Sequence, residues 1–418
     1  MKALIKKSVI CGEAATPASK SYTIRAMMCA ALAEGESRII NPLTSDDTDA
    51  ASEVLSQIGI SIIKEADCWR VKGGSFHQPQ ANLFCRDSAA TLRFMTAIAS
   101  LVPGEGCLTA GESLAKRPVE PLPSILAQLG VKCCVENGAV IVEGGRLAGG
   151  TAQLPGDISS QFVSALLLIA PLAEKGVTII LTTPPRSRPY LEMTLGCMQK
   201  FGIEVEVSNV FSRFEVKPQR YKPADYIIEG DWSSASYLLA LGAACGEVSA
   251  NNLNTNSLQG DRIMLNLLQQ MGADMEIKEH SVTVRKSNLK AITVDLADCI
   301  DLLPTMAVLA AFADGTSHFN GISRARLKES NRVLAVIDGL NKMGISVFEE
   351  ADSLIINGAE PTGAIIDSFN DHRIAMAFSI PGAKFGDTVI NEAECVAKTY
   401  PGYWEVFQNL GGEVELDV

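Results

Sequence analysis

Residues 19–63 read SKSYTIRAMMCAALAEGESRIINPLTSDDTDAASEVLSQIGISII, and this stretch decides the fold. Its apolar, alanine-rich part over 22–33 predicts a helix that stops at Gly35, and residues 37–40 predict a short strand. A polar segment then predicts the cap of a second helix. This helix ends at Gly59, where alternating apolar residues predict another strand. The stretch therefore reads as strand, helix, strand, helix and strand, and an extra strand is expected.

The same pattern recurs six times along the chain. In each copy an apolar run ends on a glycine and passes into a strand-like segment, at spacings of 67 to 72 residues: Gly59, Gly130, Gly202, Gly272, Gly344 and Gly411. A second glycine series interleaves at spacings of 69 to 72 residues: Gly35, Gly104, Gly176, Gly246, Gly315 and Gly386. Two registers with one period indicate one supersecondary unit repeated six times. Chemistry is then expected at the same few loop positions of each unit.

Six such units predict two domains. A unit of about 70 residues with two helices cannot bury its sheet alone, but three units around a pseudo-threefold axis could share one helical core. The proline-containing segment 218–231 looks like a linker. We assign residues 19–229 to one domain and residues 1–18 plus 230–418 to the other. The first strand goes with the C-terminal half, because a circular set of units must be closed by pairing its ends.

The composition is that of an ordinary globular enzyme. The chain has 418 residues, of which 47% are hydrophobic and 20% charged, and it contains no apolar run of membrane-spanning length. Its eleven cysteines include no C-x-x-C pair, which favours free thiols in a reducing cytoplasm. Four scattered histidines make a zinc site improbable. A net charge of -12 without a basic stripe argues against nucleic acid as a partner.

Basic and hydroxyl residues gather where helices are predicted to begin. A helix N-terminus presents free N–H donors and a positive dipole end, which together suit an anion. First helices of the later units are predicted near Ser88, Ser160, Ser234, Asp301 and Asp371, and second helices near Pro118, Pro189, Asp261, Arg332 and Pro401. The candidate residues at these loops are Lys20, Ser21, Arg25, Lys116, Arg117, Ser159, Ser160, Gln161, Ser187, Arg188, Arg326, Lys328, Arg332, Arg373 and Lys398. Their common register favours a shared polyanion site.

Simpler explanations stand beside this one. The serines could be ordinary N-caps, and Arg25, Arg93 and Arg117 could form ion pairs at the surface or core edge. Among the acids, Asp301 is flanked by apolar residues and Glu329 by cations. A carboxylate in a partly apolar pocket can have a raised pKa and serve in proton transfer. The alternatives are an N-cap for Asp301, a salt bridge for Glu329 and a structural hydrogen bond for His372.

Several motifs, taken together, resemble the EPSP synthase (3-phosphoshikimate 1-carboxyvinyltransferase) family. They run in the family's order over nearly the whole chain: Ser19-Lys20-Ser21 with Arg25, Leu114-x-x-Arg117-Pro118, Ser159-Ser160-Gln161-Phe162, Ser187-x-Pro189-Tyr190, Asp301-x-x-Pro304, Lys328-Glu329-Ser330-x-Arg332, Asn370-Asp371-His372-Arg373 and Ala397-Lys398-Thr399-x-Pro401. The resemblance implies an α/β (α+β) fold of two pseudo-threefold domains, each with three βαβαββ units. This enolpyruvyl transferase fold is described as an inside-out α/β barrel.

The resemblance also implies a reaction, in which the enolpyruvyl group of phosphoenolpyruvate is transferred to the 5-hydroxyl of shikimate 3-phosphate. Phosphate is released, and no metal or organic cofactor is expected. The implied ligands of shikimate 3-phosphate are Lys20, Ser21, Arg25 (on the ring carboxylate), Ser159, Ser160 and Ser187 (on the phosphate), Gln161, Asp301 and Lys328. The implied ligands of phosphoenolpyruvate are Lys20, Ala89, Arg117, Gln161, Arg332, Arg373 and Lys398.

The implied catalytic residues are Asp301, Glu329, Lys20 and His372. Asp301 would face the attacking hydroxyl, Glu329 would protonate the methylene carbon, and Lys20 would assist departure of the phosphate. Whether Asp301 or Lys20 takes the hydroxyl proton stays open. Because like-charged substrates repel, cations from two closing domains are expected to hold them, with hinges near 16–19 and 228–232.

One loop departs from the family pattern. The usual Gly-Asn-[Ala/Ser]-Gly-Thr is here Arg86-Asp87-Ser88-Ala89-Ala90, and Asn331 replaces an aspartate in the Lys328–Arg332 motif. The Ala89 methyl would protrude toward the phosphoenolpyruvate pocket, and Asp87 adds a negative charge there. Glyphosate occupies that pocket in the family and is slightly longer than phosphoenolpyruvate. We therefore hypothesise poor glyphosate sensitivity.

Two alternatives compete with this interpretation. The sister enzyme that acts on UDP-N-acetylglucosamine has the same fold, but it typically carries a Lys-x-x-x-Asn start and a loop cysteine. This chain instead has the start Lys20-Ser21-x-x-x-Arg25, and it has no cysteine between Cys107 and Cys133. A catalytically dead sugar-phosphate binding module is the other alternative, and the intact acidic and basic residues count against it. We expect a cytoplasmic monomer that binds neither nucleic acid nor membrane.

Overall fold

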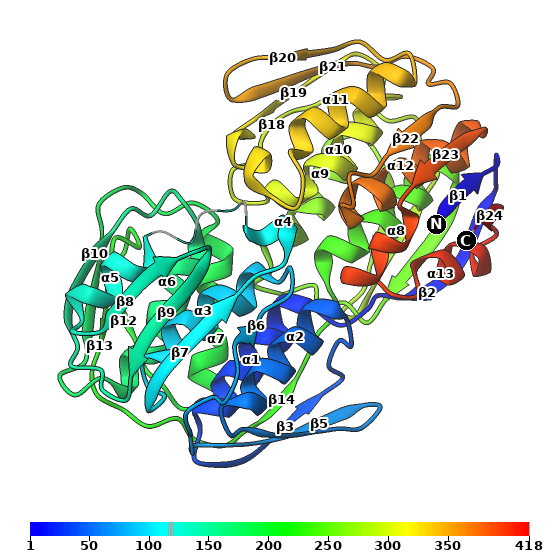
Figure 1. Cartoon of the computed structure of the whole chain (residues 1–418). Helices are drawn as coiled ribbons and strands as arrows, with labels where there is room; N and C mark the ends of the chain where they lie inside the picture. The colour runs from blue at the N-terminus through cyan, green and yellow to red at the C-terminus, as the bar shows by residue number, and fades with distance from the viewer. Residues whose placement is uncertain (116, 118, 120, 418) are drawn as a thin grey trace. The chain divides into compact units, whose positions relative to one another are not determined.

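The chain divides into two compact units (Figure 1). The computed structural model describes residues 1–115, 117, 119 and 121–417. Residues 18–228 form what is called here the N-terminal unit, and residues 1–17 with 229–418 form the C-terminal unit. Each unit buries a hydrophobic cluster of its own. No helix among the described residues is both long and apolar enough to cross a membrane, and all eleven cysteines are free thiols.

The described strands form six four-stranded sheets, one for each repeat, and all six have the same strand order and directions. The first strand is parallel to the second, the second antiparallel to the third, and the third antiparallel to the fourth. In the N-terminal unit these sheets are β14 (Asp225–Ile227), β3 (Gly35–Ile40), β5 (Cys68–Gly73), β4 (Ser61–Lys64); β6 (Leu83–Phe84), β7 (Gly104–Thr109), β9 (Ala139–Gly144), β8 (Lys132–Glu136); and β10 (Gly150–Leu154), β11 (Val177–Leu181), β13 (Arg213–Val216), β12 (Glu206–Val207).

The C-terminal unit repeats this arrangement with strands from both ends of the chain. Its sheets are β2 (Ile10–Ala15), β15 (Gly246–Asn251), β17 (Ser281–Arg285), β16 (Asp274–Ile277); β18 (Thr293–Asp295), β19 (Thr316–Asn320), β21 (Ser353–Asn357), β20 (Val347–Glu349); and β22 (Ile365–Asp367), β23 (Thr388–Asn391), β1 (Lys2–Ile5), β24 (Val414–Asp417). The N-terminal β1 thus lies between β23 and β24 and completes the sixth sheet. The predicted fold of six βαβαββ repeats is confirmed, and the described strands form separate sheets rather than a closed barrel.

The first helix of each repeat is buried, and the sheets lie outside it (Figure 1). These helices are α1 (Lys20–Leu32), α3 (Ala89–Ala99), α6 (Ser160–Ile169), α8 (Trp232–Cys245), α10 (Leu303–Ala310) and α12 (His372–Phe385). They are apolar and rich in small residues on most sides, which is the composition of a helix surrounded by protein. A polar side chain inside such a helix is therefore conspicuous, and Arg25 and Arg93 are two of them.

The second helices carry one apolar face and lie nearer the surface. They are α2 (Asp46–Gln57), α5 (Leu122–Gln128), α7 (Arg188–Lys200), α9 (Met264–Gln270), α11 (Arg332–Lys342) and α13 (Tyr403–Asn409). Short helical segments flank several of them: α4 (Glu112–Ala115), η1 (Ala170–Leu172), η2 (Gly260–Ile263), η3 (Ile300–Leu302), η4 (Ser323–Leu327) and η5 (Ala393–Lys398). Most predicted helix starts lie within about two residues of the observed starts. In the second repeat, Pro118 lies outside the described residues and α5 begins only at Leu122.

The glycine period has one physical cause. All six glycines of the first series have left-handed φ angles, between +81° and +105°. At each, the N–H of the next residue donates to a carbonyl five residues back, as Ile60 does to Leu55 and Ala273 to Leu268. This is the Schellman motif, which needs a residue without a Cβ penalty. Five glycines of the second series are also left-handed; Gly246 is the exception, with φ 175°.

Candidate functional site

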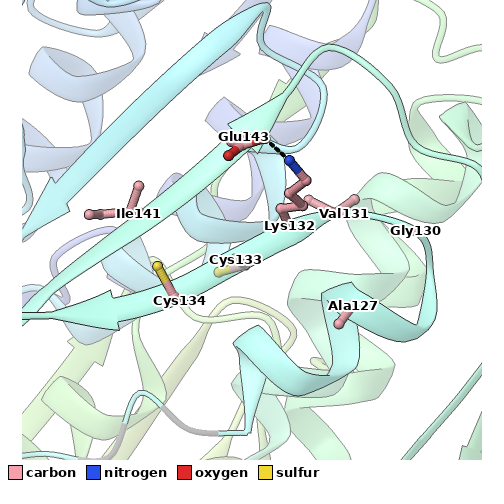
Figure 2. A pocket seen from close by; sticks show the side chains of 8 residues that line it. All are labelled: Ala127, Gly130, Val131, Lys132, Cys133, Cys134, Ile141 and Glu143. Atoms are coloured by element: carbon pink, nitrogen blue, oxygen red, sulfur yellow. Dashed lines mark hydrogen bonds and ion pairs between the residues drawn. The ribbon is translucent and has the colours of Figure 1, made fainter.

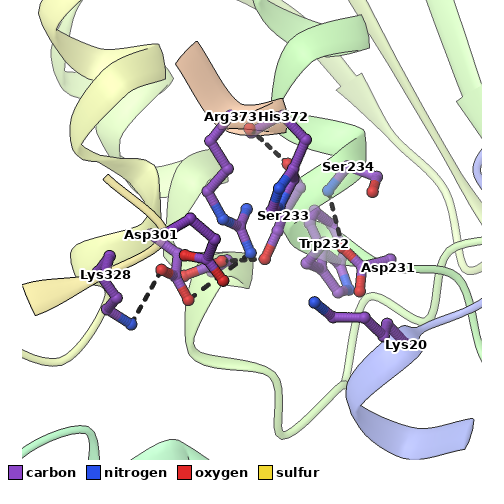
Figure 3. Close-up of polar contacts among 12 residues, drawn as sticks. Lys20, Asp231, Trp232, Ser233, Ser234, Asp301, Lys328, His372 and Arg373 are labelled. Atoms are coloured by element: carbon purple, nitrogen blue, oxygen red, sulfur yellow. Dashed lines mark hydrogen bonds and ion pairs between the residues drawn. The ribbon is translucent and has the colours of Figure 1, made fainter. Parts of the chain in front are cut away.

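The C-terminal unit brings most of its predicted site residues into one buried cluster (Figure 3). Asp301 lies in η3, Lys328 and Glu329 in the loop before α11, and Arg332 is the first residue of α11. Asp371 is the N-cap of α12 and is followed by His372 and Arg373. These residues come from repeats five and six, so the periodic loops do converge here.

Arg332 is the centre of this cluster. Its side chain is 1% exposed, and each of its nitrogens donates to a carboxylate. Nη1 lies 2.6 Å from Asp301 Oδ1, Nη2 lies 2.5 Å from Glu329 Oε2, and Nε lies 2.8 Å from Asp371 Oδ2. The planar guanidinium suits such divergent contacts, because its donors point outward in a fixed fork. One arginine therefore fixes three acids relative to one another.

Asp301 is held by cations on more than one side. Lys328 Nζ lies 3.1 Å and Arg373 Nη2 3.6 Å from its carboxylate, in addition to Arg332. Burial by itself raises the pKa of Asp301, but Arg373, Lys328 and Arg332 outweigh it and hold the pKa well below the ordinary value. The expectation of a raised pKa for Asp301 is therefore wrong. Burial in turn lowers the pKa of Lys328, against the opposing attraction of Asp301.

The start of α12 is shaped around Asp371, which is completely buried. Its carboxylate accepts hydrogen bonds from Ser330 Oγ (3.0 Å), from Arg332 and from the backbone N–H of Arg373 (3.0 Å). His372 is 1% exposed, with Nδ1 3.8 Å from Asp371 Oδ1. Phe369 and Asn370 both have left-handed φ angles of 52° just before this cap. Strained backbone of this kind often accompanies functional sites.

In the N-terminal unit, the predicted lysine has an acidic partner that sequence reasoning missed. Lys20 begins α1, and its Nζ lies 2.7 Å from Asp47 Oδ2. The side chains are 16% and 5% exposed, so this pair is largely shielded from water. Asp47 lies in the first turn of α2, within the segment that the sequence identified only as a helix cap. The ammonium is thereby held at the N-terminal end of two helices.

Arg25 is a buried cation with neutral neighbours. Its Nε donates to Thr194 Oγ1 (2.8 Å), Nη1 to the Ser21 carbonyl (3.0 Å) and Nη2 to the Tyr190 carbonyl (3.4 Å). No ion pair of Arg25 is found among the described residues, and burial lowers its pKa. A buried guanidinium of this kind favours a bound anion as the missing partner.

The N-terminus of α6 holds the predicted serine and glutamine side chains beside an additional arginine. Arg93 Nη1 donates to Gln161 Oε1 (2.6 Å) and lies 3.5 Å from Ser159 Oγ. Ser159 is the N-cap of α6, as its alternative interpretation held, and Ser160 is buried beside it. Arg93 is not among the predicted ligands, although an arginine inside the apolar helix α3 is a usable sequence signal.

Ser187 opens α7 from a left-handed backbone, with φ 55°. Its side chain is 3% exposed. Only glycine adopts this conformation without strain, so the loop holds Ser187 in a costly geometry. The hydroxyl is thus presented at a helix N-terminus, where anions bind.

The atypical loop of the second repeat has a structural explanation. Arg86 has a left-handed φ of 49°, and its guanidinium bridges Asp46 and Glu53 of α2, each at 2.5 Å. Asp87 Oδ1 accepts the Leu114 N–H at 2.9 Å and so caps α4. Ala89 is the first residue of α3 and is partly exposed.

Two further predicted cations are Arg117 and Lys398. The N–H of the half-buried Arg117 donates to the Leu114 carbonyl at 2.9 Å, whereas Lys116 and Pro118 of its motif lie outside the described residues. Lys398 ends η5 and is half-buried. Figure 2 shows a pocket between α5, β8 and β9, where Lys132 pairs with Glu143 at 2.8 Å. It contains none of the predicted site residues.

The chain matches the family model described as EPSP synthase (3-phosphoshikimate 1-carboxyvinyltransferase) over residues 5–407. It is 50% identical to the 3-phosphoshikimate 1-carboxyvinyltransferase of Dehalococcoides mccartyi over 420 residues, covering 100% of both chains. The enzyme of that name from Methanocaldococcus jannaschii is 40% identical, covering 96% of each chain. A solved structure of EPSP synthase from Acinetobacter baumannii superposes with a TM-score of 0.84 at 25% identity, covering 99% of this chain and 100% of that one.

Proposed function

Because the chain belongs to the EPSP synthase (3-phosphoshikimate 1-carboxyvinyltransferase) family, we propose that it transfers the enolpyruvyl group of phosphoenolpyruvate to the 5-hydroxyl of shikimate 3-phosphate. Phosphate is the second product. The family's reaction belongs to the shikimate pathway of aromatic amino acid biosynthesis. The observation that carries the proposal is the Arg332 cluster, in which two carboxylates of different proposed roles, Asp301 and Glu329, bind one buried guanidinium.

The two substrates together carry two phosphates and two carboxylates, so binding needs concentrated positive charge in a chain whose net charge is -12. In the N-terminal unit, Ser159, Ser160 and Ser187 are proposed to bind the shikimate phosphate, with Gln161 and Ser21 beside the ring. Arg25 is proposed to bind the ring carboxylate. Its lack of an ion pair among the described residues supports this role.

Phosphoenolpyruvate is proposed to bind the cations Lys20, Arg117, Arg332, Arg373 and Lys398, with Ala89 and Gln161 beside it. For Arg332 the geometry adds a condition. Its three nitrogens already make four hydrogen bonds to carboxylates, so at most one of its five N–H groups is left for phosphoenolpyruvate. Glu329, whose side chain is 15% exposed, is the more accessible of the two proposed catalytic acids.

In the proposed reaction the hydroxyl oxygen of shikimate 3-phosphate bonds to C2 of phosphoenolpyruvate, while its methylene carbon takes a proton from Glu329. Asp301 faces the hydroxyl and suits a proton acceptor, because its surrounding cations keep it ionised. The tetrahedral intermediate then loses phosphate and a methyl proton, which restores the double bond. Lys20 assists the departing phosphate, and His372 supports the cluster through Asp371.

An assay of phosphate release tests this function. Release is expected only when both substrates are present, and Glu329→Gln and Asp301→Asn should each lower kcat by at least about a hundredfold. Replacing shikimate 3-phosphate by UDP-N-acetylglucosamine should give no turnover. Binding of shikimate 3-phosphate without any turnover would support the dead binding module, and turnover with the nucleotide sugar would support the sister enzyme.

Glyphosate sensitivity gives a test of the altered loop. We propose that Ala89, at the start of α3, hinders the inhibitor because its methyl group narrows the phosphoenolpyruvate site. Ala89→Gly should then lower the inhibition constant for glyphosate while the KM for phosphoenolpyruvate changes much less. Tight inhibition of the native enzyme that the substitution leaves unchanged would refute this idea.

We also propose that the enzyme acts as a cytoplasmic monomer. The eleven free cysteines, several of them buried, support a reducing compartment. Light scattering on the purified protein should give a mass near 44.6 kDa, and a mass of twice that value would contradict the monomer.

A further inference from the structure

Arg93 is a buried arginine of the N-terminal unit to which the proposed reaction gives no role. It lies within the apolar helix α3 and is 8% exposed. Its guanidinium carbon lies 4.7 Å from the centre of the Phe162 ring of α6, the helix that packs against α3. An arginine over an aromatic face is attracted to the ring. This contact helps to hold the guanidinium beside the first turn of α6.

The Nη1 atom of Arg93 contacts two polar side chains at that turn. It lies 2.6 Å from Gln161 Oε1 and 3.5 Å from Ser159 Oγ. The first distance is that of a short hydrogen bond, whereas the second is at the outer limit for one. The Ser159 hydroxyl also accepts the backbone N–H of Gln161 at 3.3 Å. Gln161 is therefore the side chain that Arg93 holds most directly.

This hydrogen bond fixes which end of the Gln161 amide faces the ligand. A guanidinium has only donors, so the amide must turn its carbonyl oxygen toward Arg93 and its NH₂ group away from it. Gln161 is half-buried, and within the part of the chain that the structure describes no hydrogen bond of its Nε2 is found. The NH₂ group is thus presented as a donor of fixed orientation, next to the serines proposed to bind the shikimate phosphate.

From this arrangement we infer that Arg93 is a positioning residue, which orients the Gln161 amide so that Nε2 donates to an oxygen of shikimate 3-phosphate. Without Arg93 the amide can turn by half a rotation and present its carbonyl oxygen instead. An acceptor facing a ligand rich in oxygen atoms repels it, and the donor is lost at the same time. The inference rests on the proposed function and on the place of Gln161 beside the shikimate ring.

The experiment is a double-mutant cycle on the Kd of shikimate 3-phosphate, measured by calorimetry without phosphoenolpyruvate. Arg93→Met and Gln161→Met should each raise the Kd about tenfold, the effect of one lost hydrogen bond to a ligand. The double variant should show the same loss of about tenfold, since no amide is left to orient. A native Kd in Arg93→Met would overturn the inference. So would a loss of about a hundredfold in the double variant, which indicates an arginine that acts independently of Gln161.

Ser159→Ala provides a matched background, because it removes the other side chain that Arg93 contacts. Arg93→Met should keep its effect of about tenfold there, and an effect that disappears would assign the action of Arg93 to Ser159 and overturn the inference.

Gln161→Glu tests the orientation even if Arg93→Met does not fold. The glutamate keeps an oxygen for Arg93 but replaces the NH₂ group by a second oxygen, so the Kd should rise at least about tenfold. A native Kd in this variant would overturn the inference. Failure of the proposed function looks different, because the native enzyme itself would then not bind shikimate 3-phosphate.

Discussion

Replacing Arg332 by methionine tests the cluster that we place at the centre of the catalytic apparatus. The substitution keeps much of the side-chain volume and removes the guanidinium, so Asp301, Glu329 and Asp371 lose their common partner. All three are at most 15% exposed. Removing one partner of a buried ion pair typically costs about 3–5 kcal/mol, because the remaining charge stays buried without compensation. We expect the free energy of unfolding to fall by an amount in that range. Although three acids lose a partner, Lys328 and Arg373 still contact Asp301 and limit the loss.

A matched control lies in the same repeat. Arg326 pairs with Glu349 at 2.5 Å, but these side chains are 27% and 35% exposed. Solvated pairs of this kind contribute about 0–1 kcal/mol, so Arg326→Met should be nearly neutral. Urea denaturation followed by tryptophan fluorescence measures both, since Trp232 and Trp404 report on the C-terminal unit. Equal denaturation midpoints for the two variants would refute the reasoning. So would a free energy of unfolding of Arg332→Met within about 1 kcal/mol of the native value.

The loss in Arg332→Met should also depend on pH. The cations hold the pKa of Asp301 low, so its contribution to stability is present above the unfolded value near 4 and is lost as pH falls through the folded value. Without Arg332 the acids bind protons more readily in the folded state. The difference in stability between native and variant should therefore be largest near neutral pH and shrink toward pH 4. A difference that grows on acidification would contradict this assignment.

Two further predictions concern the repeats and the altered loop. Gly272→Ala should lower the free energy of unfolding by about 1 kcal/mol, because its φ is +82° and the new methyl meets nothing within 4 Å. Gly411→Ala should lower it more, since its Cβ would lie 2.7 Å from a backbone oxygen. Equal losses of stability in urea denaturation would argue against this ranking. Asp87→Ala should raise the KM for phosphoenolpyruvate several-fold, because it releases the Leu114 N–H. Asp87→Asn keeps an acceptor oxygen and should have the KM of the native enzyme. A similar KM in both variants would show that the cap is unimportant.

The repeat was predictable because its signal is local. A left-handed glycine after an apolar run fixes the end of a helix through hydrogen bonds within six residues, as at Gly59. Helix starts were also accessible, since Ser159 and Asp371 are caps whose residue type reveals them. In repeat two the predicted start, Pro118, lies outside the described residues, and the described helix α5 begins at Leu122.

The electrostatics of the site could not be predicted from the sequence. Apolar neighbours along the chain suggested a raised pKa for Asp301, but the groups that decide it come from Lys328, Arg332 and Arg373, up to 72 residues away. Asp47 and Asp261 were overlooked for the same reason. Each lies in a segment that looks like a helix start, and only the packing of repeats shows that Asp47 contacts Lys20 and that the charge of Asp301 acts on Asp261.

The reaction itself can be followed by ³¹P and ¹H NMR, with equimolar phosphoenolpyruvate and shikimate 3-phosphate in D₂O. Enolpyruvyl transfer predicts one equivalent of inorganic phosphate from phosphoenolpyruvate, an intact phosphate on the shikimate ring and deuterium in the new vinyl group, because the methylene carbon passes through a methyl stage. It also predicts that Glu329→Gln suppresses both product and deuterium. Phosphate released from the shikimate ring, or no change in either substrate with correctly folded enzyme, would contradict the account.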